Sequence, residues 1–286
     1  MRLISYILDG IATWGILDHT RVIPAKDLAL DLPSTLSELI ANEEAFSQLS
    51  NCWHERASGI NGRLLKDLVF LPVIQRPGKV ICLGVNYIDH AKEGGNQIGD
   101  YPAIFLRCST SLLAHGAPLK LPIFSDKLDF EAELAVVIGR TTKNVSEQEA
   151  LDSVFGYACF NDATFRDYQR KTSQWTIGKN FDATGAFGPF LVTSDELPAG
   201  CMGLRIESRL NGDVMQSANT SDMAFGVART LSLLSQTMTL EPADVVVMGT
   251  PGGVGYARTP PVWMKAGDTI EVEIEGVGIL SNPIIK

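Results

Sequence analysis

Short apolar runs separated by glycine and proline dominate the chain from about residue 78 onward. Such runs are typical of strands, whereas residues 146–151 and 221–236 have helical spacing, the second opened by a Ser-Asp cap. Strands and helices do not alternate regularly, which disfavours a doubly wound parallel sheet and predicts a mostly β, α+β fold. The predicted strands are residues 80–85, 103–106, 134–138, 154–160, 190–193, 204–210, 244–248 and 269–274.

The first part of the chain has a different pattern, with strands and a helix in close succession. Residues 2–8 and 13–17 are predicted to form paired strands around an Asp-Gly turn. Residues 36–49 have helical periodicity, and Thr35 with Glu38 forms a capping box at the start of that helix.

A boundary is expected near residue 75. The short predicted strand at 68–73 is followed by Gln-Arg-Pro-Gly, and proline and glycine favour a turn there. We therefore expect a small N-terminal α/β domain over residues 1–75 and a larger domain over 76–286.

Composition narrows the class of protein. The chain has 286 residues, 45% of them hydrophobic, which is enough for a large core. Its net charge of −9 argues against nucleic acid and anionic membranes as partners. No apolar run could span a bilayer, and no signal peptide precedes the first predicted strand. The five scattered cysteines show no metal or redox spacing, which indicates reduced thiols and a cytoplasmic location.

Three carboxylates are the most informative candidates for chemistry. Glu131 and Glu133 are two apart at the start of a predicted strand, so their side chains point the same way. On a half-buried surface they would repel each other and lose hydration, and a bound cation would relieve both costs. Together with Asp162, and without clustered Cys or His, they favour a hard cation: Mg²⁺, Mn²⁺ or Ca²⁺. The alternative is that both glutamates face water on an edge strand.

His90 and Glu93 form a second candidate pair. At a spacing of three on a short helix they share one face, and the carboxylate would orient the imidazole as a general base acting on water. The alternative is a surface pair on a polar helix. The Gly-Gly-Asn segment after Glu93 has the composition of a lid.

Four further residues are candidates for binding substrate. Lys179 either carries a solvated loop charge or neutralises a substrate carboxylate or a developing oxyanion. Arg166 and Gln169 are three apart and would point one way on a helical turn, towards the substrate. Thr250 lies in a glycine-rich loop that does not fit a phosphate-binding pattern, so we expect it to receive a substrate carboxylate.

The order of these motifs resembles that of the fumarylacetoacetate hydrolase family, in its acylpyruvate hydrolase-like branch. The resemblance departs at Arg107-Cys108, where the family usually has lysine-proline, and at Met248, where threonine is usual. It implies a β-roll or barrel whose open side holds the metal, on a homodimer formed through the catalytic domain. The matching segments are residues 79–93, 129–139, 161–169, 178–182, 248–255 and 266–270.

The roles that the resemblance implies match the candidate residues. Glu131, Glu133 and Asp162 correspond to the metal ligands, and His90 and Glu93 to the catalytic pair. Lys179 corresponds to the family's lysine, which favours a role at the substrate over a solvated charge.

Together these features predict a divalent-metal hydrolase that cleaves the C–C bond of a 1,3-diketo acid, of the acylpyruvate, fumarylpyruvate or diketo sugar acid type. The products would be pyruvate, or a substituted pyruvate, and a carboxylic acid. An oxaloacetate-type decarboxylase and a hydroxy-dienedioate isomerase stabilise the same enolate and stay open as alternatives. A non-catalytic binding module is a more remote one.

Other expectations concern residues outside these motifs. We expect loops around Arg107 and Arg258 to contact the substrate's tail. His19, His54 and His115 have no motif around them and are treated as structural. The apolar residues at 104–106 and the stretch at 168–175 are candidates for the dimer interface.

Overall fold

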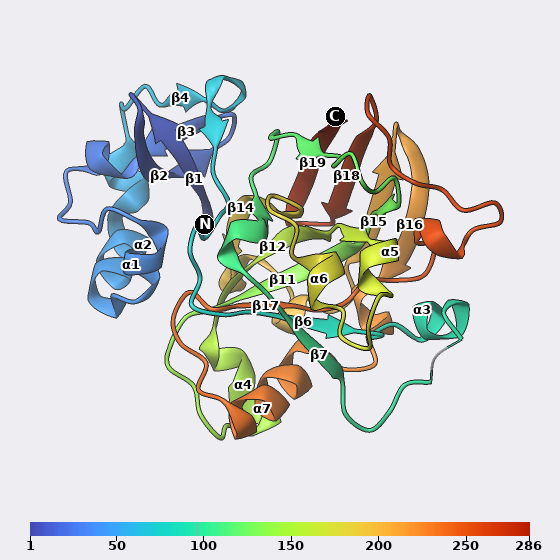
Figure 1. Cartoon of the computed structure of the whole chain (residues 1–286). Coiled ribbons are helices and arrows are strands. Elements are labelled where there is room, and N and C mark those ends of the chain that lie inside the picture. Colours follow the sequence, from blue (N-terminus) through green and yellow to red (C-terminus); the bar gives the residue numbers. More distant parts are fainter. Residues whose placement is uncertain (96) are drawn as a thin grey trace.

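The computed structural model describes residues 1–95 and 97–286 and is built mainly from strands (Figure 1). Most of them belong to one long sheet, which confirms the mostly β, α+β prediction. These strands are β1 (Arg2–Leu8), β2 (Ile11–Asp18), β3 (Arg21–Pro24), β4 (Arg63–Leu64), β5 (Val69–Phe70), β6 (Val80–Gly84), β7 (Ala103–Arg107), β8 (Leu112–Leu113), β11 (Ala132–Ile138), β12 (Val154–Asp162), β14 (Gly185–Thr193) and β17 (Val245–Val247). They run in the order β4-β3-β2-β1-β14-β12-β11-β17-β6-β7, with β5 beside β1 and β8 beside β14.

A second sheet, of order β16-β15-β18-β19-β9, packs against the middle of the first. Its strands are β9 (Leu119–Lys120), β15 (Arg205–Leu210), β16 (Asp213–Asn219), β18 (Thr269–Ile274) and β19 (Gly278–Ile285), and β10 (Leu128–Asp129) pairs separately with β13 (Thr164–Phe165). The helices are α1 (Leu36–Ile40), α2 (Glu43–Ala57), α3 (Ile88–Glu93), α4 (Glu147–Ala150), α5 (Arg166–Gln169), α6 (Thr176–Lys179) and α7 (Val227–Thr237). No helix in residues 1–95 and 97–286 is long and apolar enough to cross a membrane.

Strand β11 lies at the centre of the fold and is buried on both faces. Leu134 and Val136 pack into the core shared with the second sheet, whereas Ala135 and Val137 pack into the core on the other face. Because side chains alternate along a strand, a run buried on both sides must be continuously apolar. This explains why residues 134–138 lack the polar alternation of a surface strand.

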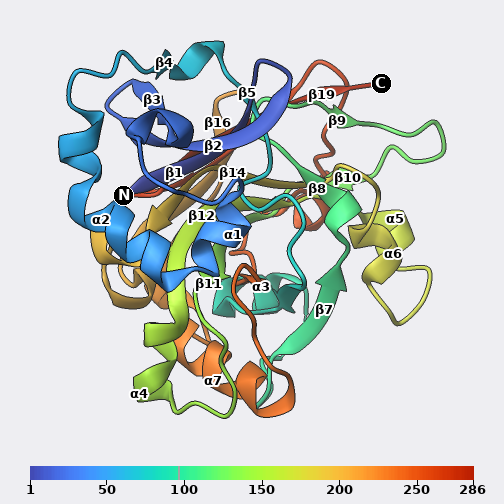
Figure 2. The same ribbon diagram turned by 90° about the vertical axis from the view of Figure 1, so that its left-hand side faces the viewer.

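The N-terminal segment forms its own lobe, seen face-on in Figure 2, yet it joins the long sheet. Strand β1 pairs antiparallel with β14, and the Phe46 ring of α2 packs at a tilt against the Phe155 ring of β12, with a centroid distance of 4.7 Å. The Thr35–Glu38 capping box is present. The proposed boundary at residue 75 stays a prediction.

Two helix predictions need correction. The helix expected at 36–49 is two helices, because the Asn42 side chain accepts the Ala45 N–H and starts α2. The helix expected at 221–236 begins only at Val227. A 3₁₀ turn, capped by the Asn219 side chain, holds the Ser-Asp pair instead. Strands β16 and β19 were not predicted.

Candidate metal centre and active site

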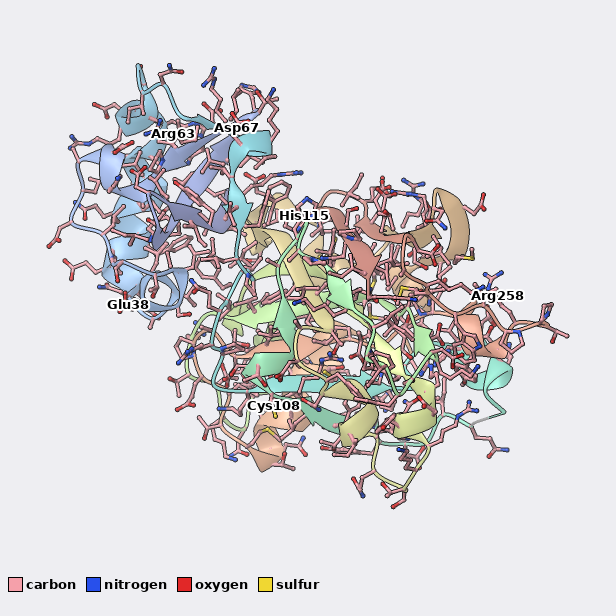
Figure 3. The ribbon with its side chains drawn as sticks, turned by 45° about the horizontal axis from the view of Figure 1, so that its top comes forward. Glu38, Arg63, Asp67, Cys108, His115 and Arg258 are labelled. Atoms are coloured by element: carbon pink, nitrogen blue, oxygen red, sulfur yellow. The ribbon has the colours of Figure 1, made fainter. Side chains whose placement is uncertain are left out.

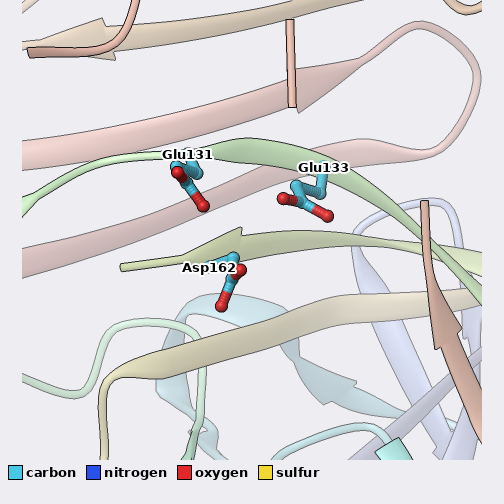
Figure 4. A group of neighbouring side chains, drawn as sticks. All are labelled: Glu131, Glu133 and Asp162. Atoms are coloured by element: carbon cyan, nitrogen blue, oxygen red, sulfur yellow. The ribbon is translucent and has the colours of Figure 1, made fainter. Parts of the chain in front are cut away.

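Glu131, Glu133 and Asp162 meet where two paired strands end. Glu131 immediately precedes β11, Glu133 lies within it, and Asp162 ends β12. These strands run antiparallel, and the Asp162 N–H donates to the Glu131 carbonyl at 3.0 Å. The three side chains converge in Figure 4, with one oxygen of each within 4.8 Å of the others. All three are buried, so neither glutamate faces water as on an edge strand.

Buried cations compensate two of these carboxylates. The Lys179 ammonium contacts Glu131 and lies 2.5 Å from Asp162 Oδ2. Arg166 Nη2 donates to Glu131 at 2.6 Å, and Arg107 donates to Asp162. Although burial opposes it, the charges of Arg166 and Lys179 hold the pKa of Glu131 well below its usual range. Burial alone would lower the pKa of Lys179, but Asp162 and Glu131 raise it, so the ammonium stays charged.

Glu133 has no such partner. Its carboxylate accepts the Gly249 N–H at 2.7 Å, and no cation in the described part of the chain pairs with it. Burial, and then the carboxylates of Asp162 and Glu131, raise the pKa of Glu133 well above its usual range. No cation among the described residues offsets the charge of an ionised Glu133, so its carboxyl favours the neutral form unless a cation binds beside it.

The donor set fits a divalent cation. With Asp129 directly behind the cluster, four buried carboxyl groups lie among three buried cations, Arg107, Arg166 and Lys179, so full ionisation of the four would leave one negative charge for a bound cation to offset. Carboxylate oxygens are the ligands that hard cations such as Mg²⁺ and Mn²⁺ prefer. Glu131, Glu133 and Asp162 are the residues that would hold the ion.

A cavity of about 250 Å³ opens on this cluster. It has an apolar wall and a polar wall, and it brings most of the sequence-predicted residues together. Arg170 and Tyr256 line it as well, although no motif had singled them out. The apolar wall is formed by Leu83, Val85, Phe105 and Trp175, and the polar wall by His90, Arg166, Gln169, Arg170, Lys179, Thr250 and Tyr256.

Two short helices position the polar wall. Arg166 and Gln169 point the same way from α5, since Arg166 Nη1 donates to Gln169 Oε1 at 2.9 Å. Helix α6 carries Lys179 and packs closely on α5 at Gly178, where an added Cβ would lie 2.4 Å from the backbone nitrogen of Gln169. Asn180 anchors the end of α6 to β7, because its Nδ2 donates to the carbonyl of the exposed Leu106 at 3.0 Å.

His90 lies on α3 with its imidazole buried at the edge of the cavity. Nδ1 faces Glu93 Oε2 at 3.5 Å but makes no hydrogen bond within residues 1–95 and 97–286. Glu93 is itself held, because both its oxygens accept the Gly253 N–H at 3.0 and 3.1 Å. Of the lid segment expected after Glu93, Asn96 lies outside the described residues.

The glycine-rich loop at residues 249–255 holds carboxylates through its backbone. Its N–H groups donate to Glu133 and Glu93, and also to Asp129. Thr250 faces the cavity, but its hydroxyl already donates to the Ala132 carbonyl at 3.0 Å. The hydroxyl is therefore committed to β11, and how Thr250 contacts substrate stays a prediction.

Asp129 connects the polar wall to this loop and was missed as a functional residue. Its carboxylate accepts Arg166 Nε at 2.8 Å, the Gly255 N–H at 2.7 Å and the Tyr256 N–H at 3.1 Å. The sequence signal for Asp129 was its position two residues before Glu131, which places the two acidic side chains on the same side of an extended segment. Apart from the adjacent Phe130, whose N–H also donates to Asp129, these partners are more than 35 residues away in the sequence, so no local pattern could reveal them.

Neither Arg107 nor Arg258 lines the cavity, and contact of the loops around them with the substrate's tail stays a prediction. Arg107 ends β7, is buried, and donates to Asp162 and to the Thr184 hydroxyl rather than lying in a loop. Arg258, labelled in Figure 3, donates to the backbone carbonyls of Gly253 and residue 215 and so braces the glycine-rich loop.

Comparison with known proteins agrees with this geometry. The family model described as "Fumarylacetoacetate (FAA) hydrolase C-terminal" matches residues 79–285. The mitochondrial oxaloacetate tautomerase fahd2 of Xenopus laevis is 38% identical over 270 residues, which cover 94% of this chain and 84% of the relative.

Two solved structures cover the whole chain. A putative HpcE protein from Mycobacterium smegmatis superposes with a TM-score of 0.89 at 30% identity, covering 99% of that structure's chain. The fumarylacetoacetate hydrolase of Exiguobacterium antarcticum superposes with a TM-score of 0.84 at 32% identity, also over 99% of its chain. With the family model matching well over half of its length and the fold shared from end to end, the chain belongs to the fumarylacetoacetate hydrolase family.

Proposed function

We propose that the protein catalyses keto–enol tautomerisation of a small 2-oxo dicarboxylate of the oxaloacetate type. The observation that carries this proposal is the single imidazole, His90, among the residues lining a small cavity beside the carboxylate cluster. One imidazole can take a proton from C3 and deliver it to the oxygen on C2, which is all that a keto–enol tautomerisation requires. The similarity to a protein named oxaloacetate tautomerase supports the same choice of substrate.

Each residue has a defined part in this reaction. Glu131, Glu133 and Asp162 would hold a divalent cation, Mg²⁺ or Mn²⁺ (Ca²⁺ is the weaker candidate), which would supply Lewis acidity to the substrate's oxygens. Lys179 and Arg166 donate hydrogen bonds to the substrate's carboxylate and orient it. His90 moves the proton between C3 and the 2-oxygen, through the Nε2 that Glu93 leaves available by facing Nδ1.

Hydrolysis of the C–C bond of a 1,3-diketo acid is the second candidate. The His90–Glu93 contact favours it, because a histidine oriented by a carboxylate is a common means of activating water. One structural relative is named fumarylacetoacetate hydrolase. Decarboxylation of oxaloacetate and isomerisation of a hydroxy-dienedioate share the enolate and are distinguished by their products.

The deciding experiment compares these reactions on one preparation of wild-type protein with Mg²⁺. Tautomerisation is followed by the absorbance of enol-oxaloacetate, decarboxylation by pyruvate release, and hydrolysis by the loss of acylpyruvate or fumarylpyruvate. We expect rapid equilibration of the oxaloacetate tautomers without pyruvate release. Faster cleavage of a diketo acid than tautomerisation would instead establish the hydrolase.

The variant His90→Ala tests the proton-transfer step. We expect it to slow tautomerisation by about 10²–10⁴-fold, the usual effect of losing a general acid–base group. Binding of Mg²⁺ should be unchanged, because His90 is not among the ligands. An undiminished rate would remove His90 from the mechanism.

A further inference from the structure

We propose that Arg170 binds the second carboxylate of the substrate, so that the site selects 2-oxo dicarboxylates over 2-oxo monocarboxylates. This inference rests on the proposed function for the identity of the substrate. Its structural basis, a guanidinium held at the cavity wall without an anionic partner, is independent of the reaction type.

Arg170 directly follows α5 and lines the cavity that contains Glu131 and Lys179. Its guanidinium carbon lies 4.6 Å from the centroid of the Tyr256 ring. Tyr256 is itself fixed, because its N–H donates to the buried Asp129 carboxylate. The guanidinium is thus held by a stacking contact on a ring whose backbone is anchored.

The neighbouring Arg166 provides a direct contrast. It stacks on the same ring at 4.4 Å, but its charge is already matched by Asp129 at 2.8 Å and Glu131 at 2.6 Å. Arg170 is exposed, and no ion pair or side-chain hydrogen bond to its guanidinium is found among residues 1–95 and 97–286. Stacking on a ring holds a cation in place without neutralising it.

Arg170 therefore has the properties of a carboxylate receptor. Its planar donor fork matches a carboxylate in a bidentate arrangement. The two arginines are four residues apart, and like charges at this spacing repel each other. An anion bound beside Arg170 would relieve that repulsion. The buried cations Lys179 and Arg166 would bind one carboxylate of the substrate. Only a substrate with a second carboxylate could then also pair with Arg170.

The test compares Arg170→Gln with Lys171→Gln. Lys171 is the adjacent residue, carries the same charge and stacks on Tyr168 at 3.4 Å, but it does not line the cavity. Two ligands that differ only in the second carboxylate, oxaloacetate and 2-oxobutyrate, are titrated by calorimetry into the Mg²⁺-loaded full-length protein.

We expect Arg170→Gln to weaken oxaloacetate binding by about 10–100-fold, the usual effect of losing a charge-assisted hydrogen bond. Binding of 2-oxobutyrate should change by less than about twofold, because it lacks the group that Arg170 contacts. Lys171→Gln should change the affinity for either ligand by less than about twofold. In kinetics, KM for oxaloacetate should rise while kcat stays nearly constant. Arg170→Lys should restore part of the lost affinity.

Two results would overturn the assignment of Arg170: Arg170→Gln weakens the binding of both ligands equally, or it weakens the binding of neither.

Failure of the proposed function would give different results. Wild-type protein that binds oxaloacetate more tightly than 2-oxobutyrate through Arg170, yet does not tautomerise it, would refute the reaction and keep the subsite. Active wild-type protein with unchanged binding in Arg170→Gln would refute the subsite and keep the reaction.

Discussion

Lys179 is tied to both the carboxylate cluster and the cavity. Its ammonium bridges Glu131 and Asp162, and its aliphatic stem is buried with them. Removing one partner of a buried ion pair leaves an uncompensated charge, which is among the more costly changes a protein can undergo. A cation bound by the same carboxylates would compensate them in its place.

We therefore expect Lys179→Met to lower the free energy of unfolding of the metal-free protein by about 3–5 kcal/mol. Mg²⁺ should raise the melting temperature of this variant more than that of wild type. Thermal unfolding with and without Mg²⁺ measures both effects, with the exposed Lys143→Met as control. Equal stability of Lys179→Met and wild type without metal would contradict the bridging role.

Among single residues, the candidate metal ligands could be predicted from the sequence better than the side chains that contact them. Strand alternation was enough to place Glu131 and Glu133 together. To place Asp162 beside the two glutamates required knowing that β11 pairs with β12, which only the family resemblance implied. Arg107 could not be placed at all, because its partner Asp162 is 55 residues away and no local pattern links them.

The glycine-rich loop shows how an element without regular structure can organise a site. Its N–H groups hold Glu93, Asp129 and Glu133, so a shift of its backbone would move all three. Gly253 is constrained in two ways: its φ is +99°, and an added Cβ would lie 2.4 Å from the carbonyl oxygen of Met215. A side chain there must displace the N–H that Glu93 accepts.

Gly253→Ala should therefore reduce kcat by at least about tenfold, since it would displace the N–H that holds the Glu93 carboxylate beside His90. Gly267→Ala is the matched control. Gly267 has nearly the same φ, +97°, but a Cβ there would meet no atom within 4 Å. Both variants should be less stable than wild type because the left-handed region is unfavourable for alanine. Equal activity in the two variants would show that the loop does not position the pair.

Element boundaries were predicted less well than element types. Asn42 ends the helical run expected at 36–49 because it caps the next helix, a role that periodicity alone does not reveal. Strand β16 was missed because Asp213–Asn219 is largely polar, and β19 because it contains proline and asparagine. Both are specified by their partners in the sheet rather than by their own composition.

At the scale of the whole molecule, His115 lies where the N-terminal lobe meets the rest of the chain (Figure 3). Its ring packs edge-on against Phe70 at 4.7 Å, and Nδ1 accepts the Ser281 N–H at 3.0 Å. Burial lowers the pKa of His115, and the more distant Glu271 opposes this only in part. The folded protein therefore resists protonation that the unfolded chain accepts.

The free energy of unfolding should accordingly fall as the pH drops below about 6.5, the ordinary pKa of histidine, because the unfolded state then binds more protons. His115→Gln keeps a hydrogen-bond acceptor but does not titrate, so its stability should depend less on pH in this range. Urea unfolding at about pH 7.5 and 5.5 measures the difference, with the exposed His19→Gln as control. Identical pH dependence in His115→Gln and wild type would rule out this contribution.

We also propose that two chains assemble through the catalytic domain. Of the interface candidates from the sequence, Phe105 is buried in the core, but Leu106 is 53% exposed and Ile177 nearby is 59% exposed. Light scattering at micromolar concentration should give twice the 31.0 kDa mass of one chain, and Leu106→Asp should shift it towards the monomer. A wild-type mass near 31.0 kDa would refute the dimer.

The most direct test of the metal centre uses Glu133→Gln. The amide keeps an oxygen for the Gly249 N–H but cannot ionise, so it removes the one carboxyl group of the cluster that has no cationic partner among the described residues. Calorimetry on chelator-treated protein should show that wild type binds Mg²⁺ and regains oxaloacetate turnover with it. Glu133→Gln should stay folded but should neither bind Mg²⁺ nor regain oxaloacetate turnover. Full turnover by metal-free wild-type protein, or by Glu133→Gln, would contradict the account.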